Sequence, residues 1–198
     1  MKVLLDNPAV QILEVDFKAG SKTPRHYHRD AFIYTLSDAR VRITGSDGKP
    51  VELDLKANQV LWRDAEMRTL ENIGGTDLHV LNFDLKKPTT KAQPIATGED
   101  PLKLSSDIYS LLLDNHRVRV LEVRAKAGAK APLHAHPGAA LYFLSDARVR
   151  FTYPDGKTEE IEQKKGHAVW LPAQSHALEV LGNATAMFLV VEMKPGKG

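Results

Sequence analysis

The chain has 198 residues, of which 42% are hydrophobic and 26% are charged, and its formal net charge is +2 at pH 7. This composition is that of a globular protein with one or two domains, and without long runs of like charge it argues against a nucleic-acid-binding arm. The absence of cysteine excludes disulfides, thiolate metal ligands and cysteine nucleophiles, so any metal ion would need His, Asp or Glu.

The chain repeats itself at a constant offset. The run LSDARVR occurs at Leu36–Arg42 and again at Leu144–Arg150, 108 positions later. About two positions in five are identical from residue 3 to residue 86, and no gap is needed to align the copies. We interpret the chain as a tandem duplication of a unit of about 85 residues, each with its own core.

The first copy, expected over residues 1–88, carries two histidines one residue apart. His26 and His28 lie in the sequence PRHYHRD. Because side chains two positions apart share a face of a strand, both imidazoles should point the same way. Further on, SDGK has the composition of a tight hairpin turn, in which Asp-Gly supplies the positive φ.

Residues 89–103 are expected to link the two copies. This segment contains prolines at 94 and 101 and hardly any apolar residues. Such a composition is typical of a linker between domains.

The second copy, expected over residues 104–198, shows the pattern of short strands most clearly. Apolar and polar residues alternate in several segments, and Gly, Pro, Asp or Asn ends each of them: VRVLEVRAKAG, ALYFLSD, ARVRFTYPDG, HAVWLPA and AMFLVVEMK. No helical pattern competes. Many short strands at spacings near ten residues predict an all-β fold, with a β-sandwich or barrel for each copy. In the strands that contain Arg40, Arg42, Arg148 and Arg150, the alternation predicts that these arginines face solvent.

Three histidines of the second copy form a candidate metal site. His134 and His136 should share one face of a strand, and His176 follows about forty residues later, after the turn at Pro172. Neutral imidazole is a nitrogen donor for Zn, Ni, Cu and Fe, and three protein ligands with an open position are typical of catalytic sites. An imidazole with the ordinary pKa of about 6.5 would make metal affinity weaken near that pH.

The spacing of these residues resembles the two motifs of the cupin superfamily. Gly128 precedes His134 and His136, and Gly166 precedes Pro172 and His176, with five residues between each glycine and the next motif residue. Two copies resemble a bicupin. The resemblance implies two tandem antiparallel jelly-roll β-barrels and one divalent transition metal (Zn, Fe, Ni, Mn or Cu), with His134, His136 and His176 at ligand positions.

Some motif positions depart from the family pattern. Ala140 and Leu141 stand where a glutamate ligand is usual, while Gln174 and Val180 replace a common glycine and asparagine. The reaction class is therefore not transferred with the fold.

The first copy departs further, because Arg68 stands at the position equivalent to His176. A guanidinium does not coordinate metal, and its charge opposes a cation. We expect this copy to be metal-free. His26, His28 and Arg68 would then form either a degenerate site or an anion site for a group such as a carboxylate, unless Asp30, Asp64 or Glu66 neutralises the arginine.

The functional expectation is a metal-binding bicupin with a three-histidine site, acting as a metal-dependent, dioxygenase-like enzyme on a small organic molecule. Two alternatives stay open, a non-enzymatic small-molecule binding or sensing cupin and a structural or storage-type cupin. Whether the protein is an enzyme is not decided, and no catalytic residue is assigned. We expect a small-molecule partner, no nucleic acid and no membrane, and a monomer or homodimer. We expect the chain to be soluble and cytoplasmic, and an exported origin stays open if a signal peptide was trimmed.

Overall fold

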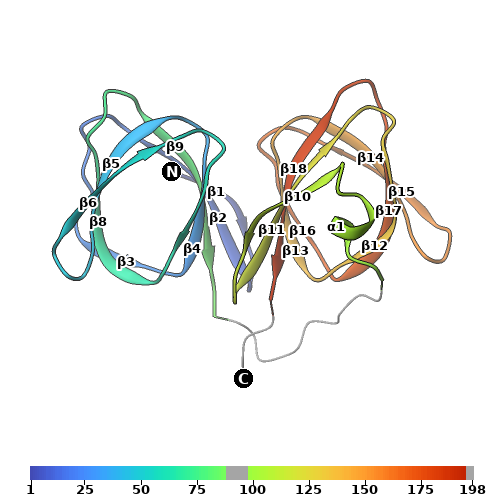
Figure 1. The fold of residues 1–198 in the computed structure, drawn as a ribbon, viewed down its shortest axis with the longest axis horizontal. Helices are drawn as coiled ribbons and strands as arrows, with labels where there is room; N and C mark the ends of the chain where they lie inside the picture. The colour runs from blue at the N-terminus through green and yellow to red at the C-terminus, as the bar shows by residue number, and fades with distance from the viewer. Residues whose placement is uncertain (88–97, 195–198) are drawn as a thin grey trace. The chain divides into compact units, whose positions relative to one another are not determined.

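The computed structural model describes residues 1–87 and 98–194. Its regular structure is almost entirely strand, which confirms the all-β expectation, and the described residues contain one short helix, α1 (Pro101–Leu104). Contacts divide the chain into two compact units, Met1–Lys87 and Pro88–Gly198 (Figure 1). None of the helical segments in the described part has the length and apolar character needed to span a membrane.

The first unit consists of nine antiparallel strands in two sheets. The five-stranded sheet has the order β1-β2-β9-β4-β7, and the four-stranded sheet has the order β3-β8-β5-β6. The strands of this unit are β1 (Lys2–Asp6), β2 (Val10–Phe17), β3 (His26–His28), β4 (Ala31–Thr35), β5 (Ala39–Thr44), β6 (Pro50–Leu55), β7 (Val60–Arg63), β8 (Glu66–Asn72) and β9 (Leu78–Leu85).

The second unit repeats this arrangement strand for strand. Its sheets have the orders β10-β11-β18-β13-β16 and β12-β17-β14-β15, the same orders shifted by nine strands. The strands are β10 (Tyr109–Asp114), β11 (Val118–Ala125), β12 (Lys130–His136), β13 (Ala139–Phe143), β14 (Ala147–Thr152), β15 (Thr158–Gln163), β16 (Ala168–Leu171), β17 (Gln174–Val180) and β18 (Ala186–Met193).

Each unit has a jelly-roll arrangement. The resemblance implied closed barrels, but the sheets of each unit do not close into a barrel. Among the described strands, hydrogen-bonded pairing stays within the five-stranded and four-stranded sheets and does not join them into a ring. Side chains between the two sheets therefore hold each unit together, as in a sandwich. In the second unit this core contains large aromatic side chains, among them Tyr109, Phe143, Phe151 and Phe188.

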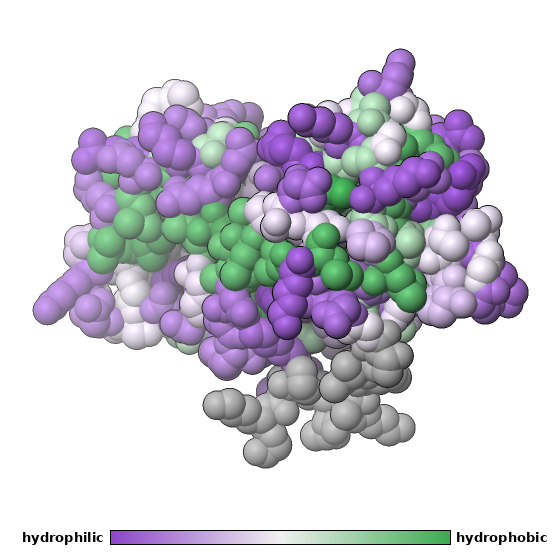
Figure 2. Space-filling view, turned by 45° about the vertical axis from the view of Figure 1, so that its right-hand side comes forward, coloured by the Kyte–Doolittle hydropathy of each residue, from purple (hydrophilic) through white to green (hydrophobic). Residues whose placement is uncertain are grey.

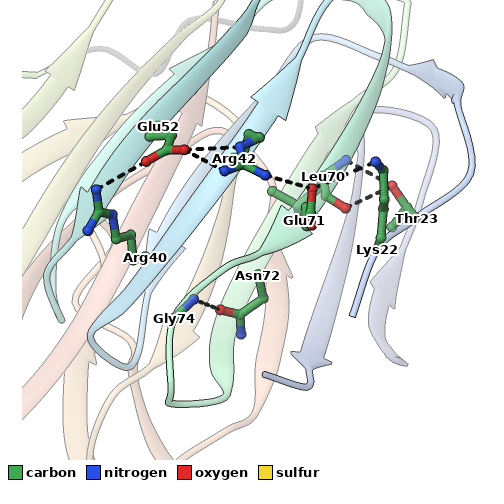
Figure 3. A network of polar contacts seen from close by, with 9 residues as sticks. All are labelled: Lys22, Thr23, Arg40, Arg42, Glu52, Leu70, Glu71, Asn72 and Gly74. Atoms are coloured by element: carbon green, nitrogen blue, oxygen red, sulfur yellow. Dashed lines mark hydrogen bonds and ion pairs between the residues drawn. The ribbon is translucent and has the colours of Figure 1, made fainter. Parts of the chain in front are cut away.

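The outer face of the four-stranded sheets is polar, as the alternation predicted. Arg42 lies between two carboxylates, at 2.7 Å from Glu52 and 3.4 Å from Glu71, and Arg40 also contacts Glu52 (Figure 3). The second unit repeats the same contacts through Arg148, Arg150, Glu160 and Glu179. Each such exposed pair contributes little to stability, and the charged side chains make this face a solvent-exposed one.

Some hydrophobic side chains also reach the surface. The face shown in Figure 2 has green hydrophobic areas between hydrophilic residues. Val3, Leu111 and Leu133 are about half exposed. Exposed apolar residues are normal in folded proteins, so these positions do not define a site.

The end of the predicted linker packs on the second unit. Residues 88–97 lie outside the described part of the chain, whereas Asp100 caps α1 by accepting a hydrogen bond from the backbone of Leu102. The same carboxylate contacts Arg119 of β11 at 2.6 Å. Asp100 therefore ties α1 to the five-stranded sheet of the second unit.

Candidate metal centre

The three predicted ligands of the second copy lie together inside the second unit. His134 and His136 are on β12, and His176 is on β17, directly opposite His134 in the register of the two strands. All three are buried, with exposed fractions of 0%, 6% and 3%. The two-residue strand period thus points both β12 imidazoles into the core, and pairing with β17 adds the third.

The imidazoles are close enough to share one ion. The ring centroids are 4.9 Å apart for His134 and His136, 4.8 Å for His134 and His176, and 5.5 Å for His136 and His176. Their candidate ligand nitrogens all lie within 4.8 Å of one another. Two nitrogens bound at about 2.1 Å to one ion lie at most about 4.2 Å apart, so the cluster is near metal-binding dimensions.

Two of the rings have their outer nitrogen fixed by an acceptor. Nδ1 of His134 lies 2.7 Å from the carbonyl oxygen of Pro132. Nδ1 of His136 lies 2.7 Å from Oε1 of Glu192. Since each Nδ1 donates its proton outward, the lone pair is on Nε2, the nitrogen that a metal would use.

Glu192 is a functional candidate that the sequence analysis missed. It is 3% exposed on β18, and its other oxygen lies 3.2 Å from Nε of Arg119, which also contacts Asp100. A buried carboxylate with an arginine and an imidazole donor has the partners that an anion needs away from water. The available signal was an acidic residue within the apolar run AMFLVVEMK.

Tyr109 is the second residue that the sequence did not reveal. Its hydroxyl lies 2.9 Å from Nε2 of His134, and the side chain is buried. Burial, with a further contribution from the charge of Glu192, raises the pKa of this phenol above its ordinary value. The hydroxyl therefore stays protonated at neutral pH and donates to Nε2 of His134. No spacing pattern in the sequence marks this tyrosine.

Burial keeps two of the imidazoles neutral well below neutral pH. It lowers the pKa of His134 to about 4, against a smaller opposing effect of the Pro132 hydrogen bond. It lowers the pKa of His176 to about 2, and the neighbouring imidazoles add to that shift. The expectation of protonation near pH 6.5 is thus wrong for these two rings, because the interior penalises the charged form.

Little space remains beside the cluster. A cavity of about 10 Å³ lies against His136 and His176 and is lined by Phe151 and Phe188 among others. Phe151 stacks on His176 with a centroid separation of 4.0 Å. Such a volume is close to that of a single water site and is too small for an organic molecule.

The donor set fits a divalent transition metal. Three imidazoles, two of them with Nδ1 held by an outward acceptor, provide three nitrogen donors, which suit Zn, Cu, Fe or Ni. The amide of Gln174 lies 3.4 Å from Nδ1 of His176, and an amide can present either its oxygen or its nitrogen there. The residues present therefore fit a metal ion bound by three histidines.

The first unit places His26, His28 and Arg68 at the equivalent positions. The two imidazole centroids are 4.2 Å apart, and Arg68 pairs with His26 in the register of β3 and β8. Arg68 is buried, with its guanidinium 3.5 Å from Glu66. Asp64, one of the expected neutralising residues, instead accepts a hydrogen bond from the indole of Trp62.

Residues outside the two clusters behave as structural residues. His79 contacts Glu14 at 3.1 Å, and His167 contacts Gln163 at 3.0 Å. Glu179 points to the opposite face of β17 from His176 and pairs with Lys130 and Arg150.

The fold and this cluster together define the class of structure. The jelly-roll sheets form a cupin-like fold, and the second unit carries a buried three-histidine group that can hold a divalent metal. Searches against protein families and curated proteins find no match.

Solved structures with a similar fold include oxalate decarboxylases. The chain is similar to a structure of oxalate decarboxylase described for its substrate binding mode and reaction specificity switch, at 15% identity and a TM-score of 0.67, covering 96% of this chain and 70% of that one. A structure of the Bacillus subtilis enzyme at pH 4.6 gives 15% identity and a TM-score of 0.67, covering 96% and 69%. A third structure, described for the Mn(II) centres of the Bacillus subtilis enzyme, gives 15% identity and a TM-score of 0.66, covering 100% and 76%. At such identities the likeness concerns the fold.

Proposed function

We propose that this chain is a bicupin whose second unit binds one divalent transition metal through His134, His136 and His176. The observation that carries the proposal is the orientation of the rings. The Nδ1 atoms of His134 and His136 lie 2.7 Å from the Pro132 carbonyl and the Glu192 carboxylate. Holding the outer nitrogen in this way is what orients histidine ligands in metal sites.

The remaining polar residues have roles that follow from their contacts. Glu192 keeps a proton on Nδ1 of His136, and Arg119 stabilises the anionic form of Glu192 at 3.2 Å. Tyr109 donates to Nε2 of His134, so its hydroxyl would move off this nitrogen when an ion binds. When bound, the ion would supply Lewis acidity at an open coordination position.

A metal-dependent enzyme acting on a small organic acid is the finer form of this proposal. The fold it shares with oxalate decarboxylases supports a small acid as the molecule to test. The cavity of about 10 Å³ means that Phe151, Phe188 or Tyr109 would have to move to admit it. A dioxygenase-like reaction, a binding or sensing module without turnover, and a storage role are the alternatives that the experiments below separate.

Elemental analysis tests the metal site. Protein purified without an affinity tag should contain about one equivalent of one transition metal per chain, and His176→Ala should lose it. His167→Ala is the matched control, because His167 is exposed and contacts Gln163. Equal metal content in wild type and His176→Ala would contradict the proposal.

Turnover separates the enzyme from the binding module. CO2 release from oxalate and O2 consumption with small organic acids should be measured for the metal-loaded protein. Activity that disappears in His176→Ala supports the enzyme. A ligand-dependent rise in thermal stability without turnover supports the binding module, and neither response supports a storage role.

A further inference from the structure

The first unit has a cavity much larger than the one beside the histidines of the second unit. Its volume is about 500 Å³, within the range of about 300–1,000 Å³ that ligand pockets occupy. All of the residues that line it belong to the first unit. Protein interiors are close-packed, so an internal space of this size requires a physical explanation.

Side-chain size at two equivalent positions contributes to the difference. Ile43 and Val80 line the cavity, and the residues 108 positions later are Phe151 and Phe188. Those two phenylalanines belong to the core of the second unit and border its small cavity of about 10 Å³. At these two positions the first unit has the smaller side chain. The opposite holds for Phe17 and Leu78, which correspond to Ala125 and Ala186, and Ile108 and Tyr109 also fill the core of the second unit.

Most of the cavity wall is apolar. Val41, Leu55, Leu78 and Val80 form a buried cluster, and further apolar residues pack against it, including Val15, Phe17, Ile33, Ile43, Leu53, Leu61 and Leu70. All of them line the cavity. Such a wall favours the apolar part of a ligand over water.

The polar part of the wall includes three arginines. The charged residues of the lining are Arg29, Arg63 and Arg68 against a single acid, Asp84. Arg63 lies 3.1 Å from Asp84, which leaves Arg68 with only a 3.5 Å contact to Glu66. The charge of Arg63 contributes to lowering the pKa of both His28 and Arg68, so these groups lie near one another.

Two buried polar atoms of this region have no hydrogen-bond partner. They are Nε2 of His28 and Nε of Arg63. Burial and the two arginines lower the pKa of His28 to about 3, so the ring is neutral at pH 7 and can donate one hydrogen bond. Buried polar atoms without partners are unusual and indicate a missing ligand or water.

We propose that the first unit binds an amphipathic monocarboxylate, with its carboxylate at Arg68, Arg63 and His28 and its apolar body in the cavity between the two sheets. Guanidinium groups form charge-assisted hydrogen bonds with carboxylates, and the unpartnered nitrogens would be satisfied by the same oxygens. This site is separate from the metal centre and does not depend on it.

Calorimetric titration with octanoate tests the proposal on the full chain. Octanoate should bind at one site per chain, and 1-octanol and acetate should each bind at least tenfold more weakly, because each lacks one half of the recognised structure. Octyl phosphate carries the same alkyl chain with a phosphate headgroup, and it should bind no more tightly than octanoate. Octanol binding as tightly as octanoate, tighter binding of octyl phosphate, or absence of octanoate binding would each overturn the proposal.

Variants locate the site. Val80→Phe copies the residue of the second unit and should weaken octanoate binding by occupying part of the cavity. Arg68→Gln should weaken it at least tenfold, whereas Arg40→Gln, which removes an exposed arginine on the outer face, should leave it unchanged. His176→Ala should also leave it unchanged, so failure of the metal proposal does not affect this test. Wild-type affinity in both folded Val80→Phe and folded Arg68→Gln would place octanoate elsewhere and overturn the proposal.

Discussion

The imidazole of His136 and the carboxylate of Glu192 face each other at 2.7 Å, with both side chains buried in the second unit. They are 56 positions apart in the chain and meet because β12 and β18 belong to the two opposed sheets. This contact decides which nitrogen of His136 carries the proton. It therefore links the core of the five-stranded sheet to the face of the four-stranded sheet that carries the three histidines.

Glu192→Gln should weaken metal binding while the fold is retained. The amide still accepts from Nδ1 of His136, but it lacks the charge that strengthens the ligand and that balances Arg119. A loss of about 10- to 100-fold in affinity is expected, the usual effect of removing such a partner. Competition with a chromophoric chelator measures it. Glu162→Gln, at an exposed position, is the control, and equal affinities in both variants would contradict the role of Glu192.

Tyr109→Phe should make metal binding more favourable. Removing the hydroxyl leaves Nε2 of His134 without its partner in the metal-free protein, at a cost of about 1–3 kcal/mol. The metal-bound protein does not use that hydrogen bond, so it should be affected less. Denaturant unfolding with and without metal measures the difference. A metal-induced stabilisation equal to that of wild type would show that Tyr109 does not compete with the ion.

The metal-free second unit should lose stability as the pH falls from about 6.5 towards 4. The unfolded chain has histidine pKa values near 6.5, whereas the folded values are about 4 for His134 and about 2 for His176. In this range the unfolded state binds protons that the folded state does not, so the free energy of unfolding decreases with decreasing pH. The slope is at most about 1.4 kcal/mol per pH unit for each histidine.

Unfolding in the presence of a chelator at several pH values tests this dependence. His176→Ala should show a smaller slope than wild type, while the exposed His167→Ala serves as the control. A stability of His176→Ala that varies with pH as steeply as that of wild type would contradict the assignment.

Arg68→His should give the first unit a metal site. The substitution copies the residue of the second unit, and Nδ1 of His26 already lies 2.8 Å from the Pro24 carbonyl, as Nδ1 of His134 lies 2.7 Å from that of Pro132. We expect the metal content to rise from about one to about two equivalents at high metal concentration. The new site should be the weaker one. Asp84 is the residue equivalent to Glu192, and its contact with Arg63 makes it less able to orient an imidazole as Glu192 orients His136. Met67→His, at the exposed neighbouring position of β8, is the control, and an unchanged stoichiometry in Arg68→His would contradict the expectation.

The sequence by itself indicated the internal repeat, the all-β class and the proximity of the three histidines, because all of these depend on local periodicity and spacing. Alternation put His134 and His136 on one face, and the repeat showed where Arg68 replaces His176. Glu192 and Tyr109 could not be assigned in this way, since their roles depend on contacts between strands far apart in the chain.

Only the tertiary structure decided how the interior of each unit is filled. The same periodic pattern gives a cavity of about 500 Å³ in one unit and about 10 Å³ in the other. Packing depends on the summed volumes of side chains that meet across two sheets, such as Phe151 and Phe188 in place of Ile43 and Val80. Burial likewise set the pKa values of His134 and His176, because desolvation is a property of the folded interior.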